Sequence, residues 1–505
     1  MEPIIDALTL TASEARELLE NDAITSEQLV KAYLTQIEAH NHKGMNLNAL
    51  ISVAPEQDLL ERARALDHER RSGLLRSELH GIPFIAKDVF VTHPALGMPT
   101  TAGNPCFATA KAKRTAPMIQ HLLDAGMILL GKSNLTEFCG LKEPMNTTGW
   151  SPAGGQTQSP YIFGGLEEDE KLIGHSSATG SSSGTAAGVA AGFAPLGIGT
   201  ECVGSVITPA NRAALYALKA GLDAINTEGC FKYADCLDCI GGMAKSVNDL
   251  NLLVSAMMQR PRVFDVSGGL SGLRIGFLDP TIWKIREELC RWPNDTRDQM
   301  ETEYWKAKDR IAGCGAIVSE ANDLSSPLEV FDFQDQSPFY EIAFYQLANI
   351  FFPAWFSEFA ESEVHSVKDI VKYNESHADI CLPPKLPKQS ELHELVVNSR
   401  TEAHAKATKT EMLKRAHENL EKQFQSCDII VAYADSSLCQ YSSAAGLPIA
   451  CMPLATVRYS EHNERPFGLC AVAKSEHLLL RFMAAYEAIF PPRPLPRPLL
   501  VSAHG

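Results

Sequence analysis

The chain has 505 residues, of which 45% are hydrophobic and 21% are charged. This composition is ordinary for a globular protein with a large core, and it excludes a chain that is disordered over most of its length. The 45 Lys and Arg residues against 61 Asp and Glu residues give a formal net charge of −16. Because no basic stretch stands out, nucleic acid and an acidic membrane surface are poor partners.

The termini and the cysteines bear on the compartment. The start, Met1-Glu2-Pro3, lacks the basic and apolar runs of a signal peptide, and no segment offers 18 uninterrupted apolar residues. The 13 cysteines are scattered and odd in number, so we expect them to be reduced in a cytoplasmic protein. Cys236 and Cys239 form one CxxC, but two further ligands at zinc spacing are not evident. We therefore predict neither a metal site nor a cofactor.

The first predicted elements form an N-terminal helical segment, residues 1–75, which we expect to pack on the core. Residues 11–14 and 25–28 read TASE and TSEQ, which fit the capping box that satisfies free N–H groups where a helix begins. A strand is expected over 47–53, and a charged helix over 56–76.

From residue 81 onward, short apolar runs alternate with helical patterns. This alternation is typical of α/β layering, so we predict an α/β fold around a mixed sheet. The expected helices are 115–124 and 185–193, and the expected strands are 82–86, 127–130, 196–199 and 273–278.

The region 285–425 is more charged and more aromatic. It reads as a largely helical insertion that covers the core, with a long helix over 402–425. Strand patterns return at 428–432 and 449–452. The tail, 491–505, is proline-rich, and we favour a simple extended terminus over a PxxP ligand for SH3-like modules.

Two sharp motifs are predicted to be decoys. Residues 126–133 read GMILLGKS, which matches the P-loop pattern, but the four central residues are apolar and suit a buried strand rather than an open phosphate loop. Residues 180–184 read GSSSG, which matches a nucleophile elbow centred on Ser182. The polar residues before it do not suit the strand that such an elbow requires.

A Ser- and Gly-rich stretch runs from residue 174 to 205, and such composition usually marks a flexible linker. Here the serines are interleaved with AAGVAAGF over 186–193, a pattern typical of a tightly packed helix. A predicted strand follows at once. A linker is rarely flanked so closely by core elements, so we interpret the stretch as part of a structured site.

At this point the chain resembles the amidase signature family over about residues 60 to 490. The resemblance implies the amidase signature fold, a central mixed β-sheet covered by helices on both faces, in a catalytic domain over 76–490. The similar blocks, in family order, are 81–88 (GIPFIAKD), 97–103 (GMPTTAG), 131–138 (GKSNLTEF), 179–185 (TGSSSGT), 200–205 (TECVGS), 445–448 (AGLP) and 465–469 (RPFGL).

The resemblance implies a Ser-cisSer-Lys triad. Ser205 would be the nucleophile, Ser181 would bridge it to Lys87, and Lys87 as a neutral amine would be the base. A serine hydroxyl is a weak nucleophile that needs such a base, and a lysine must leave water to serve as one at pH 7. The backbone N–H groups that would form the oxyanion hole are those of Cys202, Val203, Gly204 and Ser205.

The chain departs from the family pattern beside this site. Thr179, Ser183 and Val203 stand where the family has glycine, and β-branched Val203 would restrict the oxyanion loop. Many members carry an arginine two residues after the nucleophile. This position is Ile207 here, with Arg212 the nearest arginine, which puts a carboxylate-binding role of that arginine in question.

The predicted function is therefore an amidohydrolase that cleaves a carboxamide C–N bond of a small molecule through an acyl-serine intermediate. The same intermediate would serve an acyltransferase or esterase, and the altered glycines would also suit a catalytically silent binding protein. A role within a tRNA-dependent amidotransferase and a homodimer stay open. The aromatic stretch 331–356 indicates an apolar acyl group as substrate.

Overall fold

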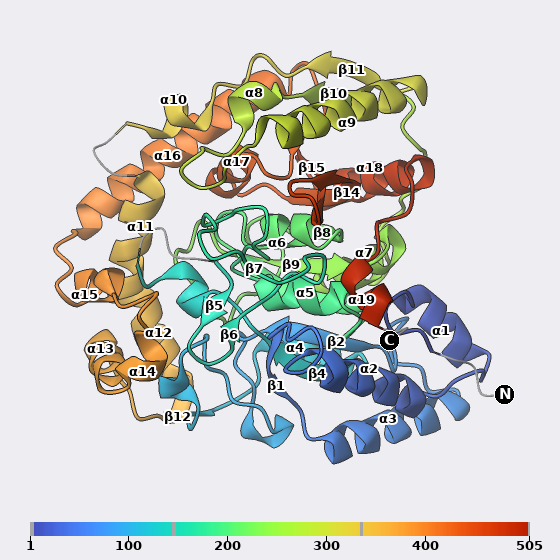
Figure 1. The fold of residues 1–505 in the computed structure, drawn as a ribbon, viewed down its shortest axis with the longest axis vertical. Coiled ribbons are helices and arrows are strands. Elements are labelled where there is room, and N and C mark those ends of the chain that lie inside the picture. The colour runs from blue at the N-terminus through green and yellow to red at the C-terminus, as the bar shows by residue number, and fades with distance from the viewer. Residues whose placement is uncertain (1–4, 144–147, 334–336, 503–505) are drawn as a thin grey trace.

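The computed structural model describes residues 5–143, 148–333 and 337–502. An 11-stranded mixed sheet runs through the molecule, from β1 near the bottom of Figure 1 to β11 at the top. In sheet order its strands are β1 (Leu50–Val53), β4 (Ile128–Ser133), β2 (Pro83–Lys87), β7 (Leu196–Glu201), β9 (Cys239–Ala244), β8 (Tyr216–Lys219), β14 (Ile449–Arg458), β15 (Glu464–Ala473), β13 (Ile429–Tyr433), β10 (Arg274–Phe277) and β11 (Ile317–Glu320).

The N-terminal helices lie beside the β1 edge of this sheet (Figure 1). Both predicted capping boxes are confirmed at α1 (Ala12–Glu20) and α2 (Ser26–His40), because each N-cap threonine accepts a bond from the third helical residue and its backbone is bonded in return. Helix α3 (Glu56–Arg71) ends five residues before the predicted 76. Gly73, at φ 75°, takes the chain into the left-handed region that stops a helix.

The segment that matches the P-loop pattern is a buried strand, as predicted. β4 pairs in parallel with β2 and antiparallel with β1. Its Lys132 is completely buried and lies 2.9 Å from an oxygen of the Asp88 carboxylate. The same ammonium donates to the Phe90 carbonyl at 2.8 Å and to Thr100 Oγ1 at 2.9 Å. Lys132 is therefore fully engaged inside the protein.

The remaining elements before residue 284 are mostly short. Helix α5 (Ser183–Ala190) begins two residues before the predicted start and packs on β2 and β7. The other elements before residue 284 are α4 (Pro117–Asp124), α6 (Ile207–Arg212), α7 (Val247–Met257), α8 (Pro280–Trp283), η1 (Pro94–Leu96), η2 (Pro105–Phe107), η3 (Glu137–Gly140), β3 (Lys111–Ala112), β5 (Trp150–Ser151) and β6 (Gly155–Gln156).

The region 285–425 is largely helical, but it also contributes β11 to the main sheet, so part of it belongs to the core. Its helices from α10 onward run along one side of the molecule in Figure 1. The elements are α9 (Asn294–Gly313), α10 (Pro327–Phe331), α11 (Pro338–Gln346), η4 (Leu347–Phe351), α12 (Phe352–Ser357), β12 (Phe359–Glu361), α13 (Val367–Ser376), α14 (Ala378–Cys381), α15 (Ser390–Val396) and α16 (Glu402–Gln423).

The C-terminal part returns to the sheet with α17 (Leu438–Ala444), β14, β15 and α18 (Glu476–Ile489). The expectation of a simple extended terminus is wrong for α19 (Arg497–Ser502), which is helical. The proline-rich stretch before it is held in place, because Tyr161 donates from its hydroxyl to the Pro494 carbonyl at 2.8 Å. Within residues 5–143, 148–333 and 337–502, no helix combines the length and the hydrophobicity that a membrane span needs.

Candidate functional site

Lys87 is the last residue of β2, the third strand from the β1 edge of the sheet, and its side chain is completely buried. β2 runs parallel to β7, so the carboxyl ends of both strands meet. The Lys87 amine donates to Ser181 Oγ at 2.7 Å, to Thr200 Oγ1 at 3.0 Å and to the Thr200 carbonyl at 3.2 Å. The predicted pairing of Lys87 with Ser181 is present, and Thr200 is a partner that the sequence did not indicate.

Ser181 follows a cis peptide bond from Gly180, as the family resemblance implies. The Ser181 carbonyl accepts a bond from the Thr136 N–H at 3.2 Å. A Cβ on Gly180 would lie 2.5 Å from Thr136 Oγ1, so this position tolerates only glycine without rearrangement. The segment is thus packed against the 134–140 region rather than free, which excludes a flexible linker.

Ser205 lies in the loop between β7 and α6 and is partly exposed. Its carbonyl accepts a bond from the Ser182 N–H at 3.1 Å, which ties the two serine-bearing loops together. Among the described residues, the Ser205 hydroxyl has no hydrogen-bond partner, so the expected bond between it and Ser181 is not formed in this state. Ser182 donates from its buried hydroxyl to the Thr200 carbonyl, which does not suit the centre of a nucleophile elbow.

The loop of residues 202–205 presents backbone N–H groups that donate to no other described residue. Gly204 is the residue in the left-handed region, at φ 77°, and a glycine adopts this conformation without cost. Val203 has no positive φ, so valine does not occupy a glycine conformation here. The loop accommodates Val203, contrary to the concern that the sequence raised.

Thr179 is the substituted glycine that does carry backbone strain. Its φ is 55°, a conformation that a β-branched residue rarely adopts. The side chain is completely buried, and its hydroxyl has no hydrogen-bond partner within the described part of the chain. Of the three residues that stand where the family has glycine, Thr179 is therefore the one with a strained backbone, and it lies two residues before Ser181.

Two residues that sequence reasoning did not single out hold the loops in place. The buried Glu201 carboxylate accepts bonds from the N–H groups of Val206 at 2.7 Å and Ile207 at 3.0 Å. Thr208 in α6 has its hydroxyl 3.1 Å from the Gly180 carbonyl and 2.9 Å from the Gly204 carbonyl. The sequence did contain a signal for Glu201, because this residue is acidic and ends a strand directly before the nucleophile loop.

Asp238 is a further acidic group near this end of the sheet. β9 is antiparallel to β7, and Cys239 is in register with Glu201, so Asp238 lies beside the start of the 202–205 loop. Burial raises the pKa of Asp238 to about 6, against the opposing effect of the bonds from the Ala234 and Tyr233 N–H groups. The carboxyl therefore titrates close to neutral pH.

Two further features concern possible metal ligands and the arginine nearest to Ser205. Across residues 5–143, 148–333 and 337–502, no three His, Cys, Asp or Glu side chains are grouped so that they could hold a metal ion. Arg212, the nearest arginine after Ser205, is 2% exposed and ion-paired with Asp435. It is therefore not free to bind a substrate carboxylate in place of the arginine that Ile207 replaces.

Comparison with known proteins agrees with this geometry. The family model of the Amidase family matches residues 28–435. A Schizosaccharomyces pombe protein that is named as a putative amidase is 26% identical over 94% of this chain and 84% of its own length. The Arabidopsis thaliana protein named as a probable amidase is 27% identical over 73% of this chain and 68% of its own length. One component of the glutamyl-tRNA(Gln) amidotransferase of Chloroflexus aggregans is 34% identical over 53% of each chain.

The structure also resembles solved structures over almost its whole length. The native peptide amidase from Stenotrophomonas maltophilia superposes with a TM-score of 0.83 at 25% identity, covering 97% of this chain and 99% of that chain. The predicted amidase signature fold is confirmed by this match. The predicted reaction class, hydrolysis of an amide C–N bond, is confirmed by the family. The chain belongs to the Amidase family.

Proposed function

We propose that the chain cleaves a carboxamide through an acyl-Ser205 intermediate. The observation that carries this proposal is the buried Lys87 amine, 2.7 Å from Ser181 Oγ, in a segment whose backbone is bonded to the Ser205 carbonyl. In the proposed relay, Lys87 acts on Ser205 through the Ser181 hydroxyl. Such an activated serine is what acyl transfer requires.

The reaction follows from these roles. Ser205 Oγ attacks the amide carbon while its proton passes to Ser181, and the Ser181 proton passes to the Lys87 amine. The N–H groups of residues 202–205 stabilise the oxyanion, and one such donor is typically worth about 10²–10³ in rate. The C–N bond then breaks, and the proton returns through Ser181 to the leaving nitrogen. Water attacks the acyl-enzyme by the same relay and releases the carboxylic acid.

The substrate class to test first is a peptide amide, because the peptide amidase matches this chain almost end to end. The amidotransferase component matches only about half of each chain. Acyl transfer is the second candidate, because the acyl-enzyme is common to both reactions. An added amine or alcohol would divert the acyl group in a transferase, and product analysis distinguishes the two reactions.

The experiment labels the protein with a fluorophosphonate and screens peptide amides for ammonia release. We expect one adduct, on Ser205, which the Ser205→Ala and Lys87→Ala variants lose. Ser182→Ala is the matched control, and there the adduct should remain on Ser205. Full turnover by Ser205→Ala would disprove the proposal, and an unlabelled Ser205 in a folded wild-type protein would favour the silent binding protein.

A further inference from the structure

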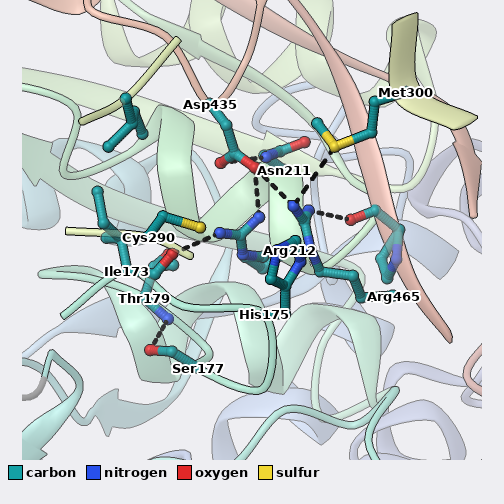
Figure 2. A network of polar contacts seen from close by, with 12 residues as sticks. Ile173, His175, Ser177, Thr179, Asn211, Arg212, Cys290, Met300, Asp435 and Arg465 are labelled. Carbon is teal, nitrogen blue, oxygen red and sulfur yellow. Dashed lines mark hydrogen bonds and ion pairs between the residues drawn. The ribbon is translucent and has the colours of Figure 1, made fainter. Parts of the chain in front are cut away.

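A buried cluster of charged side chains lies next to the segment that carries Ser181 (Figure 2). Asp435 follows β13 and is contacted by two arginines, Arg212 at the end of α6 and Arg465 in β15. Arg465 Nη2 lies 3.0 Å from Asp435 Oδ2, and Arg465 Nε donates to His175 Nδ1 at 2.8 Å. All four side chains are at most 5% exposed.

The charges in this cluster do not balance. Two guanidinium groups share one carboxylate, and neither forms an ion pair with a second carboxylate of the described residues. Burial, and then the charges of Arg465 and Arg212, lower the pKa of His175 to about 2, so the imidazole is neutral. One buried positive charge is left over. A buried charge without its own partner is costly, so packing alone does not explain why both arginines are present.

The Arg212 side chain has a second contact, which points to its role. Its Nη2 donates to the Ile173 carbonyl at 2.7 Å, whereas its Nε has no hydrogen-bond partner among the described residues. Ile173 and His175 lie in the stretch between β6 and α5, which has no helix or strand over residues 157–182. Without the ladders of regular structure, this stretch is fixed by scattered backbone bonds, such as that from the Ile173 N–H to the Leu289 carbonyl at 3.0 Å, and by side-chain contacts.

Helix α6 connects this contact to the candidate nucleophile. Ser205 lies two residues before α6, and Arg212 is its last residue. The helix therefore places the nucleophile loop at one end and the contact with Ile173 at the other. At Thr208 it also contacts the Gly180 carbonyl. A displacement of Ile173 relative to α6 would shift Ser181 relative to Ser205.

From this arrangement, we propose that Arg212 is a positioning residue, which holds the Ser181-bearing segment in register with the Ser205 loop through the Ile173 carbonyl. The inference rests on the proposed function. Arg465 performs the parallel task at His175, which stacks on Tyr459 with ring centroids 5.4 Å apart. In this arrangement the role of Arg212 is its hydrogen bond to the Ile173 carbonyl, rather than its ion pair with Asp435.

The test uses Arg212→Met in the full chain. This variant removes the excess charge and leaves Asp435 paired with Arg465, so folding should survive. We expect kcat and the fluorophosphonate labelling rate of Ser205 to fall by about 10- to 100-fold with KM nearly unchanged, because a small displacement at a distance suffices for such a loss. Arg212→Lys keeps the charge but loses the planar fork, and it should recover only part of the rate.

The decisive measurement is a double-mutant cycle of labelling rates with Ser181→Ala. If Arg212 acts through Ser181, Arg212→Met should not lower the labelling rate any further in the Ser181→Ala background. Arg70→Met is the matched control, because Arg70 also combines a buried ion pair, with Asp67, and a backbone carbonyl contact, at His80. It should lower the melting temperature and leave the labelling rate unchanged.

Three results would overturn the proposal. They are additive losses in the cycle, an equal loss in Arg70→Met, or a rise in KM at constant kcat, which would make Arg212 a substrate-binding residue. If Arg212→Met does not fold, Arg212→Lys carries the same cycle, because it keeps a positive charge beside Asp435 but loses the planar fork that also reaches the Ile173 carbonyl. Failure of the proposed function is separate, since it would appear as an unlabelled Ser205 in the wild-type protein.

Discussion

The hydroxyl of Thr208 lies 3.1 Å from the carbonyl of Gly180, so the helix after the Ser205 loop directly contacts the peptide before Ser181. Thr208→Val keeps the shape of the side chain and removes this bond. We expect the labelling rate of Ser205 to fall by about 5- to 10-fold, because one hydrogen bond contributes about 1 kcal/mol. Thr208→Ser keeps the hydroxyl and should behave like the wild type. Equal losses in both variants would contradict this role.

The strained backbone at Thr179 predicts a stabilising substitution. Thr179→Gly removes a left-handed threonine and an unpartnered buried hydroxyl. We expect the free energy of unfolding in urea to rise by about 1 kcal/mol, since such strain costs about 1–3 kcal/mol and glycine returns part of it as chain entropy. Ala178→Gly, at a neighbour without positive φ, should instead destabilise the protein. If the Thr179→Gly variant is less stable than the wild type, the backbone at Thr179 is not strained.

Glu201 supports the start of α6 through two backbone N–H groups. Glu201→Gln keeps the size of the side chain but replaces charge-assisted bonds with weaker ones. We expect the labelling rate of Ser205 to fall by about tenfold, because bonds to a charged group contribute about 1.5–3 kcal/mol. Glu487→Gln is a suitable control, since that carboxylate also accepts a backbone N–H, from Val247, which follows the end of β9 that pairs with the start of β7, opposite the loop. An unchanged rate in Glu201→Gln would exclude the role.

Glu391 predicts a pH dependence of stability. It is 7% exposed in α15 and accepts bonds from the Lys142 N–H at 2.9 Å and the Tyr340 hydroxyl at 3.3 Å. Burial, together with smaller contributions from Glu143 and Glu394, raises the pKa of Glu391 to about 7 against the opposing hydrogen bonds from Lys142 and Tyr340. The folded state thus holds a proton that the unfolded state loses near pH 4.5.

This difference in the pKa of Glu391 between the folded and unfolded states determines the direction in which stability changes with pH. Stability from Glu391 is fully present below the unfolded pKa of about 4.5 and is lost as pH rises toward about 7. The melting temperature of the wild type should therefore fall relative to Glu391→Gln between about pH 5 and 7. Above about pH 7 the difference should become constant. A difference that is independent of pH would show that Glu391 does not titrate in this range. Glu402→Gln, an exposed residue at the start of α16, is the control.

The sequence predicted those elements that local chemistry determines, but not, for example, the inner strands β8 and β9. The capping boxes at Thr11 and Thr25 give the starts of α1 and α2 to the residue. The apolar centre of residues 126–133 was sufficient to reject a phosphate loop and predict β4. The pairing of Lys87 with Ser181 was available from the family resemblance, which preserves the order of the blocks.

What the sequence could not predict depends on contacts between distant residues. Asp435 and Arg465 meet Arg212 only because β13 and β15 come together in the sheet. The φ of Thr179 is imposed by its surroundings, since threonine itself disfavours that conformation. β11 was missed because a short edge strand inside a charged, helical region has weak periodicity. The conformation of Val203 likewise depended on which loop residue took the positive φ.

The order of strands in the sheet has a consequence for synthesis on the ribosome. Lys87, Ser181 and Ser205 emerge early, but β8 has β14 as its outer neighbour, and β14 begins at residue 449. At about 5–20 residues per second, the residues between Ser205 and β14 take about 12–50 s to synthesise. Until β14 is made, β8 forms an edge of the nascent sheet, with unpaired backbone groups and with side chains that are buried in the complete fold. This edge is the surface that chaperones would need to cover.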